Sequence, residues 1–175
     1  MLIARITIFL GLFLGLSAAH GGENQALQGL QGVEVLIENF NFETGAGNVG
    51  ADGIHNKVEQ QLKRAGIPVL SRTEALQAPG KPYLYVNLNA MDNSGEGYAF
   101  SISIELKQEV TLAAQRQPVI AVTWKNHQLV TTSEQAAQPI FQVLNGQIHN
   151  FILDYMQANR ASFEPVPDKR PAKWT

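Results

Sequence analysis

Cysteine is absent from this sequence of 175 residues, so neither disulfides nor thiolate chemistry can contribute to its stability or function. Charge is sparse as well, because 13 Lys and Arg face 15 Asp and Glu, and charged residues make up only 16% of the chain. Nucleic-acid binding depends on clustered cations, and we therefore expect no nucleic-acid partner. The 45% of hydrophobic residues is typical of one globular domain of ordinary size.

The N-terminal segment has a composition of its own. Arg5 is its only charge, an apolar stretch covers residues 6–16, and the small residues Ser17-Ala-Ala19 follow. This pattern predicts a secretory signal peptide over residues 1–19, cleaved near Ala19, because roughly 11 apolar residues are too few to span a bilayer. An uncleaved anchor is the alternative. We therefore expect a periplasmic or secreted protein with no stable membrane span after cleavage.

The rest of the chain divides into three segments by composition. Residues 20–32 are rich in Gly and Gln and predict a flexible lead-in. Residues 33–160 alternate between apolar and polar side chains and predict a single folded domain. Residues 161–175 contain three prolines without periodicity and predict a disordered tail.

The first part of the domain reads as a strand, a helix and a short strand. Residues 33–40 are rich in β-branched side chains and predict the first strand, whereas apolar residues recur at helical spacing from Asp52 to Gly66. Residues 67–70 predict a second, parallel strand that completes a right-handed βαβ unit. Ser71 then stands at capping-box spacing before a short helix.

Three longer strands and a helix complete the domain. Residues 83–90, 100–112 and 119–132 predict an antiparallel meander with one dry face, and an apolar stripe predicts a helix from Pro139 onward. Together these elements predict a two-layer α+β fold, in which two main helices cover a mixed, mostly antiparallel sheet. Inward-facing positions in the meander are predicted at Leu84, Val86, Leu88, Ala90, Phe100, Ile102, Ile104, Leu106, Val110 and Leu112, and Ile120, Val122 and Trp124 are predicted to share a side.

Several motifs that suggest catalysis or ligand binding fail on inspection. The glycines of residues 45–50 fit a dinucleotide-binding pattern, but the helix is predicted to start only after the third glycine. Residues 92–97 resemble the start of a calcium loop, yet Ser103 occupies the position where a bidentate Glu is required. Glu105 and Glu109 lie about 13 Å apart on one strand, which is too far for paired acid–base catalysis. We therefore predict a protein that is not an enzyme and has no resident cofactor.

Histidine offers one alternative hypothesis. Cleavage after Ala19 would leave His20 as the mature N-terminus, where its α-amine and imidazole could chelate Cu(II) together. The mature N-terminus of lytic polysaccharide monooxygenases resembles this arrangement, but the resemblance covers only His20 and Gly21. A second ligand would be needed, and His127 is the candidate that we favour over His55 and His149.

The C-terminal tail offers a candidate docking peptide. It combines cations with one aromatic side chain, namely Lys169, Arg170, Lys173 and Trp174. Disorder is the competing interpretation of the same residues. If the tail is a docking peptide, we expect its partner to be a protein of the cell envelope.

Three segments carry a resemblance to known proteins: residues 66–71, 82–89 and 100–107 look like those of small exported bacterial proteins of unknown function. The order of elements is also similar to the amino-terminal domain of the Tol-Pal translocation protein and to the periplasmic domain of the curli secretion channel. The resemblance implies an α+β envelope domain and no site residues. We therefore expect a non-catalytic periplasmic module that binds an envelope protein or component, with a copper protein as the alternative.

Overall fold

The described part of the chain comprises four ranges. The computed structural model describes residues 25–38, 50–92, 97–133 and 137–160. The predicted signal peptide, His20 and the predicted tail, with Lys169, Arg170, Lys173 and Trp174, lie outside these residues. Those sequence-based expectations stay predictions.

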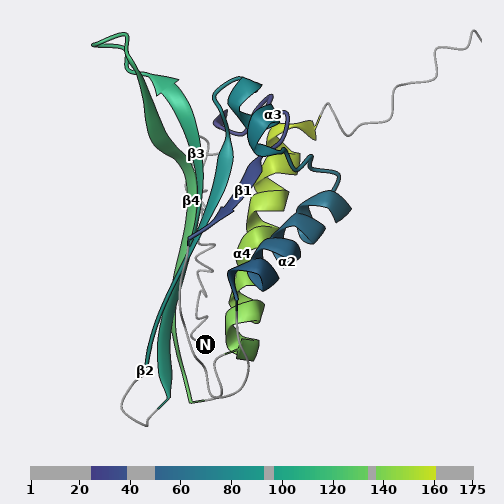
Figure 1. The fold of residues 1–175 in the computed structure, drawn as a ribbon, viewed down its shortest axis with the longest axis vertical. Coiled ribbons are helices and arrows are strands. Elements are labelled where there is room, and N and C mark those ends of the chain that lie inside the picture. Colours follow the sequence, from purple (N-terminus) through teal and green to yellow (C-terminus); the bar gives the residue numbers. More distant parts are fainter. Residues whose placement is uncertain (1–24, 39–49, 93–96, 134–136, 161–175) are drawn as a thin grey trace, which may run out of the picture.

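A four-stranded mixed sheet forms one layer of the fold, and two helices cover one of its faces (Figure 1). The strands are β1 (Glu34–Ile37), β2 (Tyr83–Asp92), β3 (Tyr98–Thr111) and β4 (Pro118–Thr132). They lie in the order β1-β2-β3-β4, with β1 parallel to β2 and the other neighbours antiparallel. The helices are α2 (Ala51–Arg64), α3 (Arg72–Gln77) and α4 (Ala137–Ala158). The predicted α+β class is confirmed.

The dry face of the sheet follows the two-residue period of β2 and β3. Its buried side chains are Leu84, Val86, Leu88, Phe100, Ile102, Ile104 and Leu106. The helices cover this face with Ile54, Val58 and Leu62 from α2 and with Ile140, Leu144, Ile148, Phe151 and Tyr155 from α4. The core therefore lies between the sheet and the helix pair, as the sequence pattern predicts.

A β-bulge in β4 overturns one part of the predicted pattern. Trp124 and Val122 pair with consecutive residues of β3, so Thr123 is an extra residue without a partner across the ladder. The extra residue reverses the alternation of faces, so Trp124 is buried in the core whereas Ile120 and Val122 lie on the opposite, outer face. The prediction that Ile120, Val122 and Trp124 share one side is therefore wrong.

Deletion of Thr123 is expected to preserve the fold, because it removes the extra residue and leaves every pair of the ladder intact. The deletion removes a hydrogen bond from Thr123 Oγ1 to Gln108 Oε1 of 2.6 Å, at a cost of about 1 kcal/mol. Deletion of Ser103 is the control, because in the regular centre of β3 it shifts neighbouring side chains to the wrong face. Circular dichroism and urea unfolding compare the two variants, and an unfolded Thr123 deletion would contradict the bulge assignment.

The hairpin between β3 and β4 extends past the helix layer (Figure 1). Val110 is accordingly half-buried, and Leu112 is 42% exposed. Both were expected to face the core, because the alternation of apolar side chains continues to the end of β3. The two-residue period predicts which face of the sheet a side chain points to. Whether that side chain is buried depends on how far α2 and α4 extend along this face.

Local signals at the helix ends are mostly confirmed. Helix α2 begins at Ala51, one residue before Asp52, where the helical spacing of the sequence begins. Gly66, with φ 75°, follows the end of α2 as expected for a helix-terminating glycine. The predicted capping box opens α3, because Ser71 Oγ accepts a hydrogen bond from Glu74 N at 3.3 Å and Glu74 Oε2 accepts one from Ser71 N at 2.7 Å.

Two predicted elements differ in extent. Residues 67–70 form no full strand and contribute one isolated parallel bridge, between Val33 and Val69. Helix α4 begins at Ala137, before the expected Pro139. The parallel partner of β1 is β2, so the crossover after β1 contains both α2 and α3.

The predicted lead-in is partly folded. Leu27 and Leu30 are buried in the main core. Asn159, after the end of α4, accepts a hydrogen bond from Gly29 N at 2.8 Å and donates one to Leu27 O at 2.9 Å. Tyr155 Oη donates to Leu30 O at 2.7 Å. We call these contacts the terminal clasp. The folded domain therefore begins before residue 33, and the expectation of a flexible lead-in is wrong for residues 25–32.

Candidate functional site: an open strand edge

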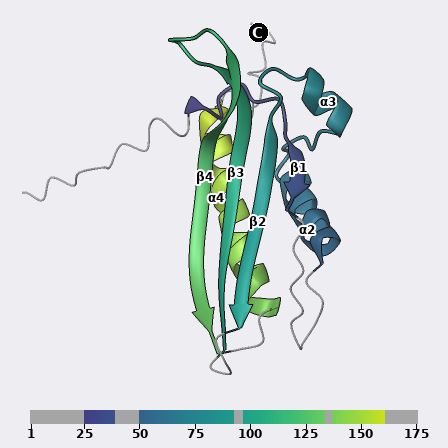
Figure 2. The same ribbon diagram turned by 60° about the vertical axis from the view of Figure 1, so that its left-hand side comes forward.

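The outer edge of β4 is the most distinctive surface of the fold (Figure 2). β4 pairs with β3 alone, so no strand among the described residues occupies its other edge. The strand is 15 residues long, begins with Pro118, and carries one permanent charge, on Lys125. Natural edge strands are usually kept short or protected by several charges, because their free N–H and C=O groups can pair with another chain. Apart from Pro118 at its start and the bulge at Thr123, this edge has little such protection.

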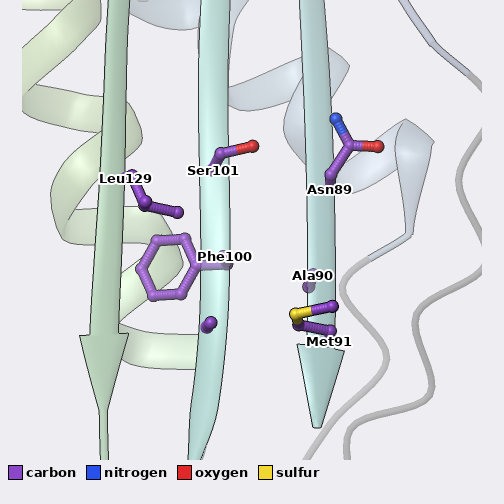
Figure 3. Close-up of a pocket in the computed structure, with 7 residues that line it drawn as sticks. Asn89, Ala90, Met91, Phe100, Ser101 and Leu129 are labelled. Carbon is purple, nitrogen blue, oxygen red and sulfur yellow. The ribbon is translucent and has the colours of Figure 1, made fainter. Parts of the chain in front are cut away.

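Apolar side chains accompany the edge on the outer face of the sheet. Ile120, Val122 and Leu129 are 52%, 48% and 68% exposed. Beside Leu129 lies a small hollow of about 160 Å³, and Figure 3 shows the Leu129 side chain extending from β4 toward the neighbouring strand. The hollow is lined by Asn89, Ala90, Met91, Ala99, Phe100, Ser101 and Leu129. The outer side of the edge therefore offers apolar contacts to an added strand.

The inner side of the edge is a groove between β4 and α4, with a volume of about 410 Å³. We call it the edge groove, and it is lined by Trp124, Lys125, Asn126, His127, Asn150, Leu153 and Asp154. Trp124 and Asn126 occupy inward positions of β4, opposite Leu106 and Ile104. The groove thus lies where the inward side chains of a further strand would project.

Trp124 is held in one orientation at this groove. Its Nε1 donates a hydrogen bond to Asp154 Oδ2 at 2.9 Å, and its ring meets Phe151 edge to face, with centroids 5.1 Å apart. Buried indoles normally require such a partner for the N–H group. Because Thr123 reverses the alternation of β4, this large side chain is directed into the core and toward α4.

The charged side chains on the two faces of the sheet at β4 differ in whether they form ion pairs. On the outer face, Lys125 Nζ lies 2.8 Å from Glu105 Oε1, and Lys107 Nζ lies 3.4 Å from Glu105 Oε2. The hydrogen bond from Lys125 holds the pKa of Glu105 below its usual value, and the nearby Lys107 contributes in the same direction. The charge of Lys125 is therefore compensated within the sheet.

Asp154 has no such compensation. It is the only Asp or Glu in α4, and it forms no ion pair among the described residues. The hydrogen bond from Trp124 engages one carboxylate oxygen, Oδ2. The edge groove therefore contains a half-buried carboxylate without an ion-pair partner in the part of the chain that the structure covers, because Lys125, which also lines the groove, is paired with Glu105.

A second groove, of about 400 Å³, lies between α3 and the outer face of the sheet. Its three cations already have partners. Arg72 forms an ion pair with Glu34 at 3.0 Å, and Lys81 forms one with Glu109 at 2.6 Å. Lys107 is paired with Glu105, and its Nζ lies 3.8 Å from the centre of the Tyr85 ring. The lining residues are Glu34, Leu36, Arg72, Ala75, Leu76, Lys81, Tyr83, Tyr85, Lys107 and Ile120. Because its charges are satisfied internally, this groove offers a ligand less than the edge groove does.

The sequence-based candidates are not brought together. His127 lies exposed on β4, opposite Ser103 on the outer face, and His20 is outside the described residues. In the portion of the chain that can be described, no group of three or more His, Asp or Glu side chains could hold a metal ion. The copper hypothesis stays a prediction. The calcium-like segment 92–97 lies mostly outside the described ranges, and Glu109 is an ion-pair partner of Lys81.

Comparison with known proteins adds no functional label. No protein-family model matches the chain, and no curated protein matches it significantly. Within the described helices, none is both long and apolar enough to cross a membrane.

Proposed function

We propose that the protein is an exported, non-catalytic binding module, and that it adds an extended segment of a cell-envelope protein to the open edge of β4. The observation that carries the proposal is the length of this edge combined with its single permanent charge. Strand addition supplies affinity through main-chain hydrogen bonds and specificity through pockets for alternate side chains. β4 offers both, because its free edge is accompanied by the exposed side chain of Leu129 on the outer face and by the edge groove on the inner face.

A second copy of the chain fits this edge less well. In a symmetric antiparallel pair over the whole of β4 (Pro118–Thr132), the central residue, Lys125, would lie opposite its own copy. Like charges directly opposite one another destabilise a strand pair. We therefore favour an extended segment of a different protein as the partner.

Leu129→Lys is expected to weaken peptide binding at least about tenfold, because it removes an apolar contact and adds a charge to the edge. The probes are short extended peptides selected from a display library against the wild-type protein. Leu76→Lys is the matched control, since Leu76 is 50% exposed and belongs to α3, near the opposite edge of the sheet. Both exposed positions should change stability by no more than about 0.5 kcal/mol.

Backbone methylation of the selected peptides separates strand addition from other modes of binding. Methyl groups on successive peptide nitrogens should weaken binding at every second position, because only alternate N–H groups of an added strand face β4. Peptides that bind Leu129→Lys as tightly as the wild type, or that show no two-residue period, would refute strand addition. So would a library that yields no binding peptide.

Export is tested separately. When the full chain is produced in a bacterium, the protein recovered from the periplasm is expected to begin at His20, because the small residues 17–19 form the cleavage site. N-terminal sequencing and intact mass measure this result. A protein that retains Met1 and stays in the cytoplasm would contradict the proposed export but would leave strand addition at β4 untouched.

A further inference from the structure

A strand added to β4 would place alternate side chains on the inner side of the sheet. Side chains of paired strands that lie directly opposite one another share a face, so those side chains would project next to Trp124 and Asn126. The edge groove lies at this place, and α4 closes its other side with Asn150, Leu153 and Asp154. An added strand would therefore extend an inward side chain into the edge groove.

The chemistry of the groove discriminates between possible side chains. Leu153 provides the apolar surface of the groove, because it is 50% exposed and free to pack against a ligand, whereas Trp124 lines the groove but is only 3% exposed. Asn126 and Asn150 contribute amides. Lys125 is engaged with Glu105 on the outer face, which leaves Asp154 as the uncompensated charge of the groove among the described residues.

From this combination we infer that the edge groove binds a basic side chain, Arg or Lys, from the extended segment that is added to β4. The long aliphatic stem of such a side chain would pack against the exposed Leu153, while its charged end would reach Asp154. An ion pair with a half-buried carboxylate that has no other ion-pair partner is stronger than one on an open surface. The inference rests on the proposed function, because the added strand delivers the side chain.

The partner is thereby defined more narrowly. It is an extended segment with apolar side chains toward the outer face, where Ile120, Val122 and Leu129 are exposed, and with a cation at one inward position. A segment whose inward position is acidic would place two carboxylates close together in the groove. Such a segment should be rejected, which gives the edge a means of selecting among strands.

The test is a double-mutant cycle on the selected peptides. Peptides that bind the wild-type protein are expected to carry Arg or Lys at one fixed position, in phase with the two-residue methylation period. Replacing that arginine by citrulline, its neutral isostere, should weaken binding to the wild type about tenfold. The same replacement should change little with Asp154→Asn, whose amide oxygen can still accept the hydrogen bond from Trp124.

Asp52→Asn is the matched control, because it removes one negative charge from an exposed position on α2, outside the edge groove. In that variant, citrulline should cost as much as in the wild type. Equal costs of citrulline in the wild type and in Asp154→Asn would overturn this inference while leaving strand addition intact. Selected peptides that show the two-residue methylation period but carry no basic residue would also overturn the inference and leave strand addition intact. If no peptide binds the edge, the proposed function fails together with the inference.

Discussion

Phe151→Ala is expected to lower the free energy of unfolding by about 3–5 kcal/mol. Phe151 is fully buried at the centre of α4, between Trp124, whose ring centroid is 5.1 Å away, and Tyr155, whose centroid is 6.3 Å away. Truncation leaves a cavity that a three-ring cluster cannot close, and the edge-to-face contact with Trp124 is lost as well. Because small domains are stable by only about 5–15 kcal/mol, this one change removes a large fraction of the total.

Urea unfolding followed by tryptophan fluorescence measures the effect of Phe151→Ala directly, since Trp124 is the neighbour of the altered residue. Leu153→Ala is the control on the same helix. Leu153 is half exposed, so its truncation should cost far less than the loss of a fully buried ring. Equal losses for the two variants would show that the α4–sheet interface is not the centre of the core.

The second large effect is expected for Asn159→Ala, which should destabilise the protein by about 2–4 kcal/mol. Asn159 is 8% exposed, and its amide makes three hydrogen bonds, with Gly29 N, Leu27 O and Tyr155 O, at 2.8, 2.9 and 2.9 Å. The substitution removes all three side-chain hydrogen bonds, each worth about 0.5–1.5 kcal/mol, although Leu27 O still accepts a hydrogen bond from Leu30 N and Tyr155 O from Asn159 N.

Asn56→Ala is the control for the clasp, because Asn56 is exposed on α2. Amide hydrogen exchange provides a second, independent measurement of the effect of Asn159→Ala. The amide of Gly29 should lose protection in Asn159→Ala but keep it in Asn56→Ala. Unchanged stability and protection in Asn159→Ala would mean that the N-terminal turn is held by the burial of Leu27 and Leu30 alone.

Most of the fold follows from local rules of the sequence. The buried faces of β2 and β3, the capping box at Ser71 and the glycine that ends α2 are each specified by neighbours in the chain. Two-residue periodicity fails at Thr123, because one extra residue changes the phase and nothing in residues 119–132 marks its position. The periodicity also fails to predict burial toward the tip of the β3–β4 hairpin. There the alternation of apolar side chains continues, but the hairpin extends beyond the helices that would cover them (Figure 1).

The N-terminal turn and the edge groove could not be predicted in this way. Leu27 and Leu30 stand among Gly and Gln without any period, and their burial is decided by elements more than a hundred residues away. Trp124 and Asp154 are 30 residues apart and meet only because the bulge turns the indole inward. A solitary acid on the apolar helix α4 was the one signal that could have marked the groove.

The terminal clasp has a consequence for the order in which the molecule is assembled. The bond between Gly29 and Asn159 joins residues 130 positions apart, near the two ends of the described fold. The first folded turn therefore finds its partners only when the last helix has emerged from the ribosome. The proximity of the two ends also predicts that a circular permutant, joined from residue 160 to residue 25 by a short linker, should fold.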